Sequence, residues 1–143
     1  MLARLPAALE QQLQCDSQLS YVEYYVLASL SDQADRTMRM SGLAVLANSE
    51  LSRLSHLMGR LEKRGFVRRA PDPTDGRYTN AILTDAGYAH LVKSAPGHVA
   101  RVRELIIDVL DPDALCSLRS CSDQIVARID EEVRGPGKPP SCP

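Results

Sequence analysis

The spacing of apolar and polar residues predicts a mostly helical chain with one short β-hairpin near its centre. Apolar residues recur at helical spacing in residues 2–14, 20–30, 42–48, 49–64, 84–110 and 112–134. Residues 66–69 and 78–83 are typical of two short strands, and the prolines and the Asp75-Gly76 pair between them favour a turn. Residues 31–40 are polar, and we expect a loop there.

Helix ends can also be read from the sequence. Ser20 and Glu23 have the spacing of a capping box, Thr84 precedes the long fifth helix, and Asp111-Pro112 opens the last one. Ser41 is a candidate cap for residues 42–48, and Asn48 or Ser49 for the helix that follows. Pro96-Gly97 predicts a kink or break in the fifth helix. Gly135 is expected to end the last helix.

The helix predicted at 49–64 has two chemically distinct faces. Leucines and one methionine share the apolar face, which consists of Leu51, Leu54, Met58 and Leu61. The opposite face is polar and basic and consists of Ser52, His56, Arg60 and Lys63, with Arg53 at its border. Gly65 predicts the end of this helix, because glycine adopts the left-handed conformation easily.

The segment from 48 to 78 contains seven cations and four acids, a net charge of +3. A helix that carries short hydroxyls and cations fits a DNA major groove, where side chains reach base edges and phosphates. An arginine at a hairpin tip can reach the adjoining minor groove. An amphipathic helix with an ordinary solvated face is the alternative at this point.

Three runs in this region, SRLSHLMGRLEKRGFVRR, PDPTDGR and LTDAG, resemble the MarR family of winged helix-turn-helix repressors. In that family the recognition helix ends in a segment like Leu61 to Val67. A wing with an Asp-x-Arg tip follows, here Asp75-Gly76-Arg77, and then an LT-x-AG entry to the next helix. The resemblance is collinear and covers most of residues 19 to 133.

The resemblance implies a mainly α fold with a small β-hairpin wing, in which a winged helix-turn-helix core is joined to a helical dimerisation region. Residues 1–134 would form a single domain, with the winged lobe at about 19–90 and dimerisation helices at about 1–14 and 91–134. The first helix of the motif would brace the second, which reads DNA. Residues 135–143 are rich in Pro and Gly and are expected to be disordered.

Position on the predicted helix and wing selects the candidate DNA-binding residues, which are Ser49, Ser52, Arg53, Ser55, His56, Arg60, Asp75, Gly76 and Arg77. Ser52, Ser55 and His56 are candidates for base edges, and Arg53 and Arg60 for bases or phosphates. The resemblance implies that Asp75 steadies the wing by pairing with arginine and that Arg77 is the wing-tip arginine. The family often has Thr or Ser at the position of Arg53 and Arg at that of His56, so base preference does not carry over.

The terminal helices predict a homodimer. Their apolar stripes have no evident partner in the winged lobe, and a two-fold dimer would bury them. Such a dimer, which the resemblance also implies, would hold two recognition helices about 34 Å apart, one turn of DNA. Packing of these helices onto the lobe of the same chain is the alternative.

The family also binds small phenolic or anionic ligands where the dimer helices meet the DNA-binding lobe. Tyr21, Tyr24 and Tyr25 are the candidates for such an effector pocket, since tyrosine combines an apolar wall with a polar tip. Core packing is the plainer interpretation. His90 and His98 are eight residues apart and belong to no convergent ligand set, so we expect no metal site.

The four cysteines, Cys15, Cys116, Cys121 and Cys142, are scattered and lack the spacing of a zinc site or a disulfide framework. We expect three small buried hydrophobes and one thiol in the tail. A redox switch is the alternative, because the peroxide-sensing members of the family use a cysteine on the first helix. Cys15 lies too close to the second helix to match that position.

The distribution of charge and the lack of long apolar runs limit the possible functions and the expected location of the protein. The chain carries a net charge of −1, and residues 101–133 hold four arginines and eight acids, so affinity for DNA must come from the segregated basic centre. No apolar run is long enough to span a membrane and no leader is recognisable, so a cytoplasmic location is expected.

These features predict a sequence-specific, DNA-binding transcriptional regulator. We expect a homodimeric repressor on a palindromic operator in double-stranded DNA, released by a small-molecule effector. No catalytic constellation, phosphate loop or cofactor site is recognisable, so we do not expect an enzyme. A constitutive DNA-architectural protein and a winged-helix protein-interaction module remain alternatives, although the latter would favour an uncharged, apolar helix face.

Overall fold

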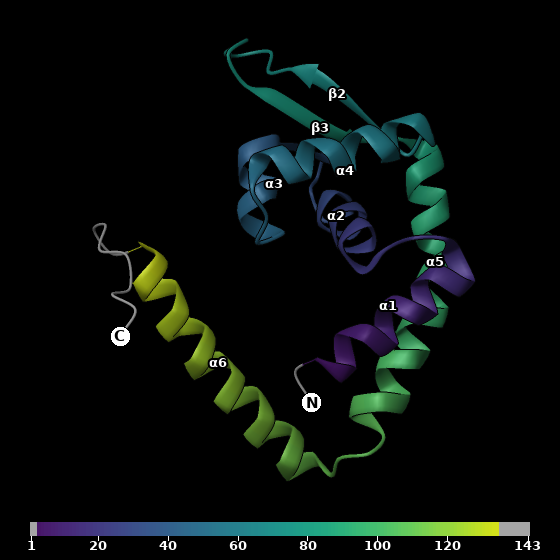
Figure 1. Ribbon diagram of the computed structural model, residues 1–143, viewed down its shortest axis with the longest axis vertical. Coiled ribbons are helices and arrows are strands. Elements are labelled where there is room, and N and C mark those ends of the chain that lie inside the picture. Colours follow the sequence, from purple (N-terminus) through teal and green to yellow (C-terminus); the bar gives the residue numbers. More distant parts are fainter. Residues whose placement is uncertain (1–2, 135–143) are drawn as a thin grey trace. The chain divides into compact units, whose positions relative to one another are not determined.

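The computed structural model describes residues 3–134, which form a mainly helical fold with one small antiparallel sheet (Figure 1). The helices are α1 (Arg4–Ser17), α2 (Tyr21–Ser31), α3 (Met40–Leu46), α4 (Leu51–Lys63), α5 (Asp85–Val102) and α6 (Pro112–Arg134). A π-helical segment, η1 (Arg103–Ile107), follows α5. The strands are β1 (Thr37–Arg39), β2 (Val67–Pro71) and β3 (Thr79–Leu83). The predictions for Gly135, the tail at 135–143 and Cys142 lie outside the described residues.

The chain divides into two compact units, one ending at Val102 and the other beginning at Arg103. An apolar core made by α2, α3, α4, α5 and the sheet holds the first unit together. Leu27 of α2, Leu43 of α3 and Leu61 of α4 are fully buried in it, beside Val67 and Ala81 of the sheet. Each such large side chain stabilises the fold by roughly 1.5–3 kcal/mol. In Figure 1, α4 runs between the hairpin and α2, so one face of α4 is buried and the other is left to solvent.

Several helix ends follow the predicted caps. The Ser20 hydroxyl accepts from the Glu23 N–H at 3.1 Å, and the Glu23 carboxylate accepts from the Ser20 N–H at 2.9 Å. The Thr84 hydroxyl accepts from Gly87 N–H at 3.0 Å, and the Asp111 carboxylate from Ala114 N–H at 2.8 Å. Gly65 has a φ of +77° just after α4, as the predicted helix stop requires.

The predicted caps at Ser41 and at Asn48 or Ser49 are wrong. Helix α3 begins after Arg39 and α4 after Glu50, and neither of these residues makes a side-chain capping bond. Met40, the first residue of α3, is buried, so packing accompanies that boundary where no side-chain cap is made.

The predicted loop at 31–40 contains a strand. Strand β1 pairs antiparallel with β3, with Thr37 opposite Ile82 and Arg39 opposite Asn80, which gives the strand order β1-β3-β2. Three residues are too few to show an alternating pattern, and the strand exists because β3 offers it an edge.

Two predicted apolar faces are shifted. Leu51 was assigned to the buried face of α4 but is 53% exposed, and Leu57 is buried instead. The buried stripe is centred on the later turns, which leaves Leu51 at its edge. Helix α2 was expected to be buried on most sides, yet Tyr21, Val22 and Tyr25 are exposed at its first turns.

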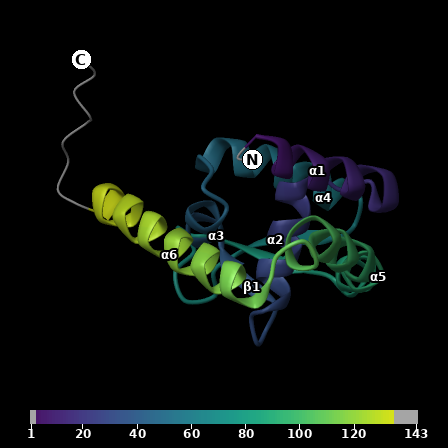
Figure 2. The same ribbon diagram turned by 90° about the horizontal axis from the view of Figure 1, so that it is seen from below.

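Helix α1 finds part of its packing within the first unit, contrary to the expectation that its stripe lacks a partner there. Leu9 and Leu13 are buried, and α1 contacts both α2 and α5. The two helices α1 and α5 cross in Figure 1 and lie on the same side of the unit in Figure 2. A Cβ on Gly97 would lie 3.3 Å from the Asp16 carboxylate, so this glycine permits the close approach of α1. Helix α5 continues through Pro96-Gly97 to Val102, so of the kink or break predicted there the break is wrong.

The second unit consists of η1 and α6, and no side chain from Arg103 to Glu131 is buried. Ile125, Val126 and Ile129 form an exposed apolar stripe on α6, each more than half exposed. Cys15, Cys116 and Cys121 are exposed as well, so the expectation that they are buried is wrong. Two of them lie on α6, which has no covered face within the described part of the chain.

We predict opposite stability effects for alanine at two glycines. A Cβ on Gly87 would clash with the backbone carbonyl of Phe66, which is held in place because it accepts from Thr84 N–H at 3.0 Å. Gly87→Ala should therefore lower the free energy of unfolding by about 3 kcal/mol. At Gly59 the nearest atom to a new Cβ is 4.0 Å away, so Gly59→Ala should raise it by about 0.5–1 kcal/mol. Urea unfolding measures both, and equal stabilities would contradict the assignment of Gly87 to a close contact.

Candidate nucleic-acid interface

The outer face of α4 presents three of the predicted site residues to solvent. Ser52, Arg53 and His56 are all exposed, because the buried leucines on the other face fix the rotation of the helix. Among the residues that the structure describes, Arg53 and Lys63 have no recorded ion-pair partner. Ser49 lies just before the helix, where its hydroxyl is 3.3 Å from the Glu50 carbonyl oxygen. The helix therefore offers hydroxyls, an imidazole and uncommitted cations on one surface.

Arg60 lies at the flank of α4 that faces α2. Its Nε donates to the Glu23 carboxylate at 3.2 Å, and Glu23 is the buried capping residue of α2. Arg60 was predicted as a contact to bases or phosphates. In the structure one edge of its guanidinium joins α4 to α2, and 60% of the side chain remains exposed.

Ser55 lies at the opposite flank of α4, which faces the hairpin. Arg69 of β2 crosses to this flank and donates to the Glu62 carboxylate through Nη2 at 2.7 Å and Nε at 3.2 Å. Its Nη1 is 3.4 Å from the Ser55 hydroxyl. The hydrogen bonds from Arg69 lower the pKa of Glu62. Arg69 thereby joins the hairpin to α4, and the basic sequence run in which it lies did not indicate this role.

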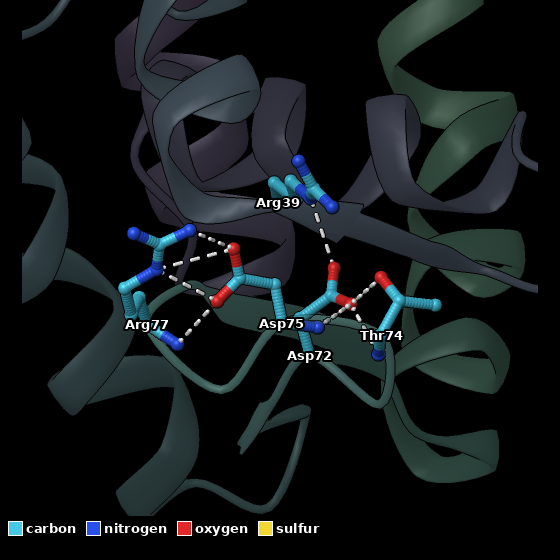
Figure 3. A network of polar contacts seen from close by, with 5 residues as sticks. All are labelled: Arg39, Asp72, Thr74, Asp75 and Arg77. Atoms are coloured by element: carbon cyan, nitrogen blue, oxygen red, sulfur yellow. Dashed lines mark hydrogen bonds and ion pairs between the residues drawn. The ribbon is translucent and has the colours of Figure 1, made fainter.

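The resemblance implied that Asp75 pairs with an arginine, and at the wing tip that arginine is Arg77 (Figure 3). Asp75 accepts from the Arg77 backbone N–H at 3.1 Å, from Nε at 3.0 Å and from Nη2 at 2.7 Å. These bonds lower the pKa of Asp75 and raise the pKa of Arg77. The Arg77 side chain is still 85% exposed, and Gly76 has open space around its Cα. The pair orients the arginine without covering it.

A second ion pair in the wing was missed by the sequence analysis. Arg39 of β1 donates through Nε to the Asp72 carboxylate at 2.9 Å, as Figure 3 shows. The other Asp72 oxygen accepts from Thr74, through Oγ1 at 2.6 Å and the backbone N–H at 2.8 Å. Bonds from Thr74 and Arg39 hold the pKa of Asp72 far below its usual range. No local pattern connects residues 33 positions apart, so only the fold could reveal this pair.

The helix and the wing border one shared hollow of about 260 Å³. Leu51 and Ser55 of α4, Arg69 of β2 and Arg77 of the wing are among its lining residues. Two arginines from two elements therefore line one depression beside α4, and each is also paired with a carboxylate. This arrangement is suited to an anionic ligand that passes between helix and wing.

Two of the three candidate effector tyrosines line one hollow. Tyr21 and Tyr25 line a hollow of about 200 Å³ with Val22 and the end of α3, including Leu46. Tyr24 is not among its lining residues; its ring centre is 4.5 Å from that of His98 on α5, and the Tyr21 ring centre is 6.4 Å from the same imidazole. Burial raises the pKa of Tyr24 and lowers the pKa of His98.

The two histidines of α5 make separate contacts. His98 Nδ1 is 3.1 Å from Gln12 Oε1, and His90 Nε2 is 2.9 Å from the Ser17 carbonyl oxygen. Within residues 3–134, no group of three or more His, Cys, Asp or Glu side chains is placed to hold a metal ion. No helix in the same range has the length and apolar content to cross a bilayer.

A helix-turn-helix with a basic outer face and an arginine-tipped wing defines a winged helix-turn-helix protein. Comparisons with known proteins give its family. A sequence model of the MarR family matches residues 17–77. Sco3205 of Streptomyces coelicolor, a MarR family transcriptional regulator solved in complex with DNA, is 40% identical with a TM-score of 0.85; the match covers 94% of this chain and 82% of that one. The chain belongs to the MarR family of winged helix-turn-helix transcriptional regulators, which is not a class of enzymes.

Other relatives agree with this assignment. Mb0904 of Mycobacterium bovis, an uncharacterized HTH-type transcriptional regulator, is 31% identical over 126 residues, which cover 86% of each protein. YkoM of Bacillus subtilis, also an uncharacterized HTH-type transcriptional regulator, is 32% identical over 80 residues. That match covers 56% of this chain and only 51% of YkoM.

Proposed function

We propose that this protein is a homodimeric repressor that binds a palindromic operator in double-stranded DNA. Each subunit would place α4 in a major groove, with Ser52, Arg53 and His56 toward base edges and phosphates, and Arg77 of the wing toward the adjoining minor groove. The complex of the relative Sco3205 with DNA supports the choice of ligand.

The shared hollow between α4 and the wing carries the proposal. A DNA strand that separates a major groove from the next minor groove has to pass between a helix in one and a wing in the other. The hollow has α4 on one side and the wing on the other, and Arg69 and Arg77 line it. A phosphate is the anion that DNA would present there. The acids of this surface do not oppose an anionic ligand. Glu62, Asp72 and Asp75 are each paired with an arginine, so the other cations of the surface are in excess.

The test is selection of bound sequences from random DNA, followed by affinity measurements on the selected site at several salt concentrations. A dimer that makes about six phosphate contacts should show a log–log slope near −5. A flat slope at the selected site would favour a protein-interaction module. Equal affinity for all sequences would favour a constitutive DNA-architectural protein.

Arg77→Ala should weaken binding to the selected site by roughly 10- to 100-fold, because one minor-groove contact is lost. The side chain is exposed, so a circular-dichroism melt should remain nearly unchanged. Lys93→Ala removes the same charge from an exposed position on α5 and is the matched control. Equal affinities of the two variants would exclude Arg77 from the interface.

The dimer part of the proposal rests on the apolar stripe of α6. Ile125, Val126 and Ile129 lie within one sector of the helix surface and are more than half exposed. A helix with no buried side chain gains little stability from its own chain, so a second copy that covers this stripe would stabilise it.

Charges placed in this stripe should break the dimer. The double variant Ile125→Glu/Ile129→Glu should sediment as a monomer and bind a palindromic site about 100-fold more weakly, because the avidity of two linked half-sites is lost. Gln124→Glu/Ala127→Glu adds the same charges on the opposite face of α6 and should remain dimeric. A dimeric stripe variant would remove α6 from the interface.

An effector that releases the repressor is the third part of the proposal. The hollow beside Tyr21 and Tyr25 supports a small aromatic or anionic ligand there. Its 200 Å³ is below the usual range of about 300–1,000 Å³ for ligand sites, so a wall from the second subunit would be needed. The test is to add hydroxybenzoic acids and other phenolic acids to the protein–DNA complex. If none of these compounds changes the complex, this part of the proposal is overturned.

A further inference from the structure

Arg39 lies at a junction of three elements. It is the last residue of β1, it pairs with Asn80 of β3, and it immediately precedes α3. Sheet and helix therefore fix its backbone. Its guanidinium lies over the Tyr78 ring, 4.4 Å from the ring centre, and its Nε donates to Asp72. The side chain thus extends from the helix-turn-helix to both ends of the wing loop.

Asp72 continues this connection to the wing tip. Its side chain is only 8% exposed, although it lies on a surface that faces solvent. While Oδ2 accepts from Arg39, Oδ1 accepts from the backbone N–H groups of Thr74 and Asp75, at 2.8 and 3.3 Å. Asp75 in turn orients Arg77. Figure 3 shows the complete path from Arg39 through Asp72 and Asp75 to Arg77.

We propose that Arg39 and Asp72 are a positioning pair that holds the wing at a fixed place relative to α4, so that Arg77 and the outer face of α4 engage DNA together. The inference rests on the proposed DNA-binding function. Two contacts fix the Arg39 side chain, because its Nε donates to Asp72 and its guanidinium plane lies over the Tyr78 ring. A carboxylate beside DNA repels phosphates, so Asp72 contributes to binding through geometry and not through its charge.

The sign of the effect of Asp72→Asn separates geometry from charge. Asparagine keeps the oxygen that accepts from Thr74 but presents an amide to Arg39, which cannot accept its hydrogen bond. Loss of a negative charge alone would tighten DNA binding. Loss of positioning should instead weaken it roughly 10-fold, a size typical of coupling between contacting residues. Glu50→Gln removes an exposed acid beside α4 and should not weaken binding. Tighter binding by Asp72→Asn would overturn the proposal.

A double-mutant cycle tests whether Arg39 acts through Arg77. Arg39→Met keeps the packing on Tyr78 and should weaken binding roughly 10-fold in the parent, but less than about 2-fold in the Arg77→Ala background. Arg68→Met removes an exposed cation of β2 and should have the same effect in both backgrounds. Equal effects of Arg39→Met in both backgrounds, with a salt slope reduced by about 1, would make Arg39 a direct phosphate contact and overturn the proposal.

Amide hydrogen exchange without DNA gives a readout that does not depend on the proposed function. Asp72 N–H donates to the Tyr78 carbonyl at 2.9 Å, and Tyr78 N–H to the Asp75 carbonyl at 3.0 Å. In Arg39→Met both amides should exchange roughly 10-fold faster, while Ala81 within the sheet keeps its rate. Unchanged rates would overturn the positioning role. If the two amides exchange faster in Arg39→Met and the full-length protein binds no DNA, the positioning role of Arg39 is confirmed and only the proposed DNA-binding function is contradicted.

Discussion

The buried face of α4 is the constraint on which the rest of the first unit depends. Leu54, Met58 and Leu61 are almost completely removed from solvent, and this burial fixes the rotation of the helix about its axis. The polar residues on the opposite face of α4 are exposed because the helix is held in this rotation. Two arginines then secure the flanks, Arg60 to Glu23 of α2 and Arg69 to Glu62 from the hairpin side. The hydrophobic effect determines which face is presented, and the ion pairs determine how firmly its neighbours are held against it.

The arginines of this surface have two different physical roles. Arg39 and Arg69 have carboxylate partners on other elements, so they join parts of the lobe. Arg77 has its partner two residues away, which orients the side chain and leaves it exposed. Exposed ion pairs contribute little to stability one by one, so their main effect is geometric. Acidic residues on a basic surface can therefore support binding indirectly, because their ion pairs fix the positions of exposed cationic side chains.

The second unit poses a different physical problem. From Arg103 to Glu131 it buries no side chain, yet α6 carries an apolar stripe and three of the chain's exposed aliphatic residues. Isolated helices gain most of their stability from packing, so such a helix depends on contacts beyond its own surface. Residues 101–133 also carry a net negative charge, in contrast to the net positive charge of residues 48–78.

Local sequence determined the features whose causes are local. Helical periodicity located the helices, and short-range hydrogen bonds made the capping box at Ser20, the cap at Thr84 and the stop at Gly65 predictable. The wing motif resembles that of the MarR family, so Asp75 was expected to pair with an arginine, and the structure identifies Arg77 as that partner. The polar face of α4 followed from the positions of its leucines.

Only the tertiary structure decided the features that join distant residues. Strand β1 needs the edge of β3, and α1 buries Leu9 and Leu13 because Gly97 lets it approach α5. The partners of Arg39, Arg60 and Arg69 come from elements that no periodicity connects to them, so only the fold shows that these three arginines join parts of the lobe. The sequence by itself determined which residues are basic and which face of α4 is polar. The fold determined which of those charges are committed and which remain exposed, because ion pairing depends on distances that only packing sets.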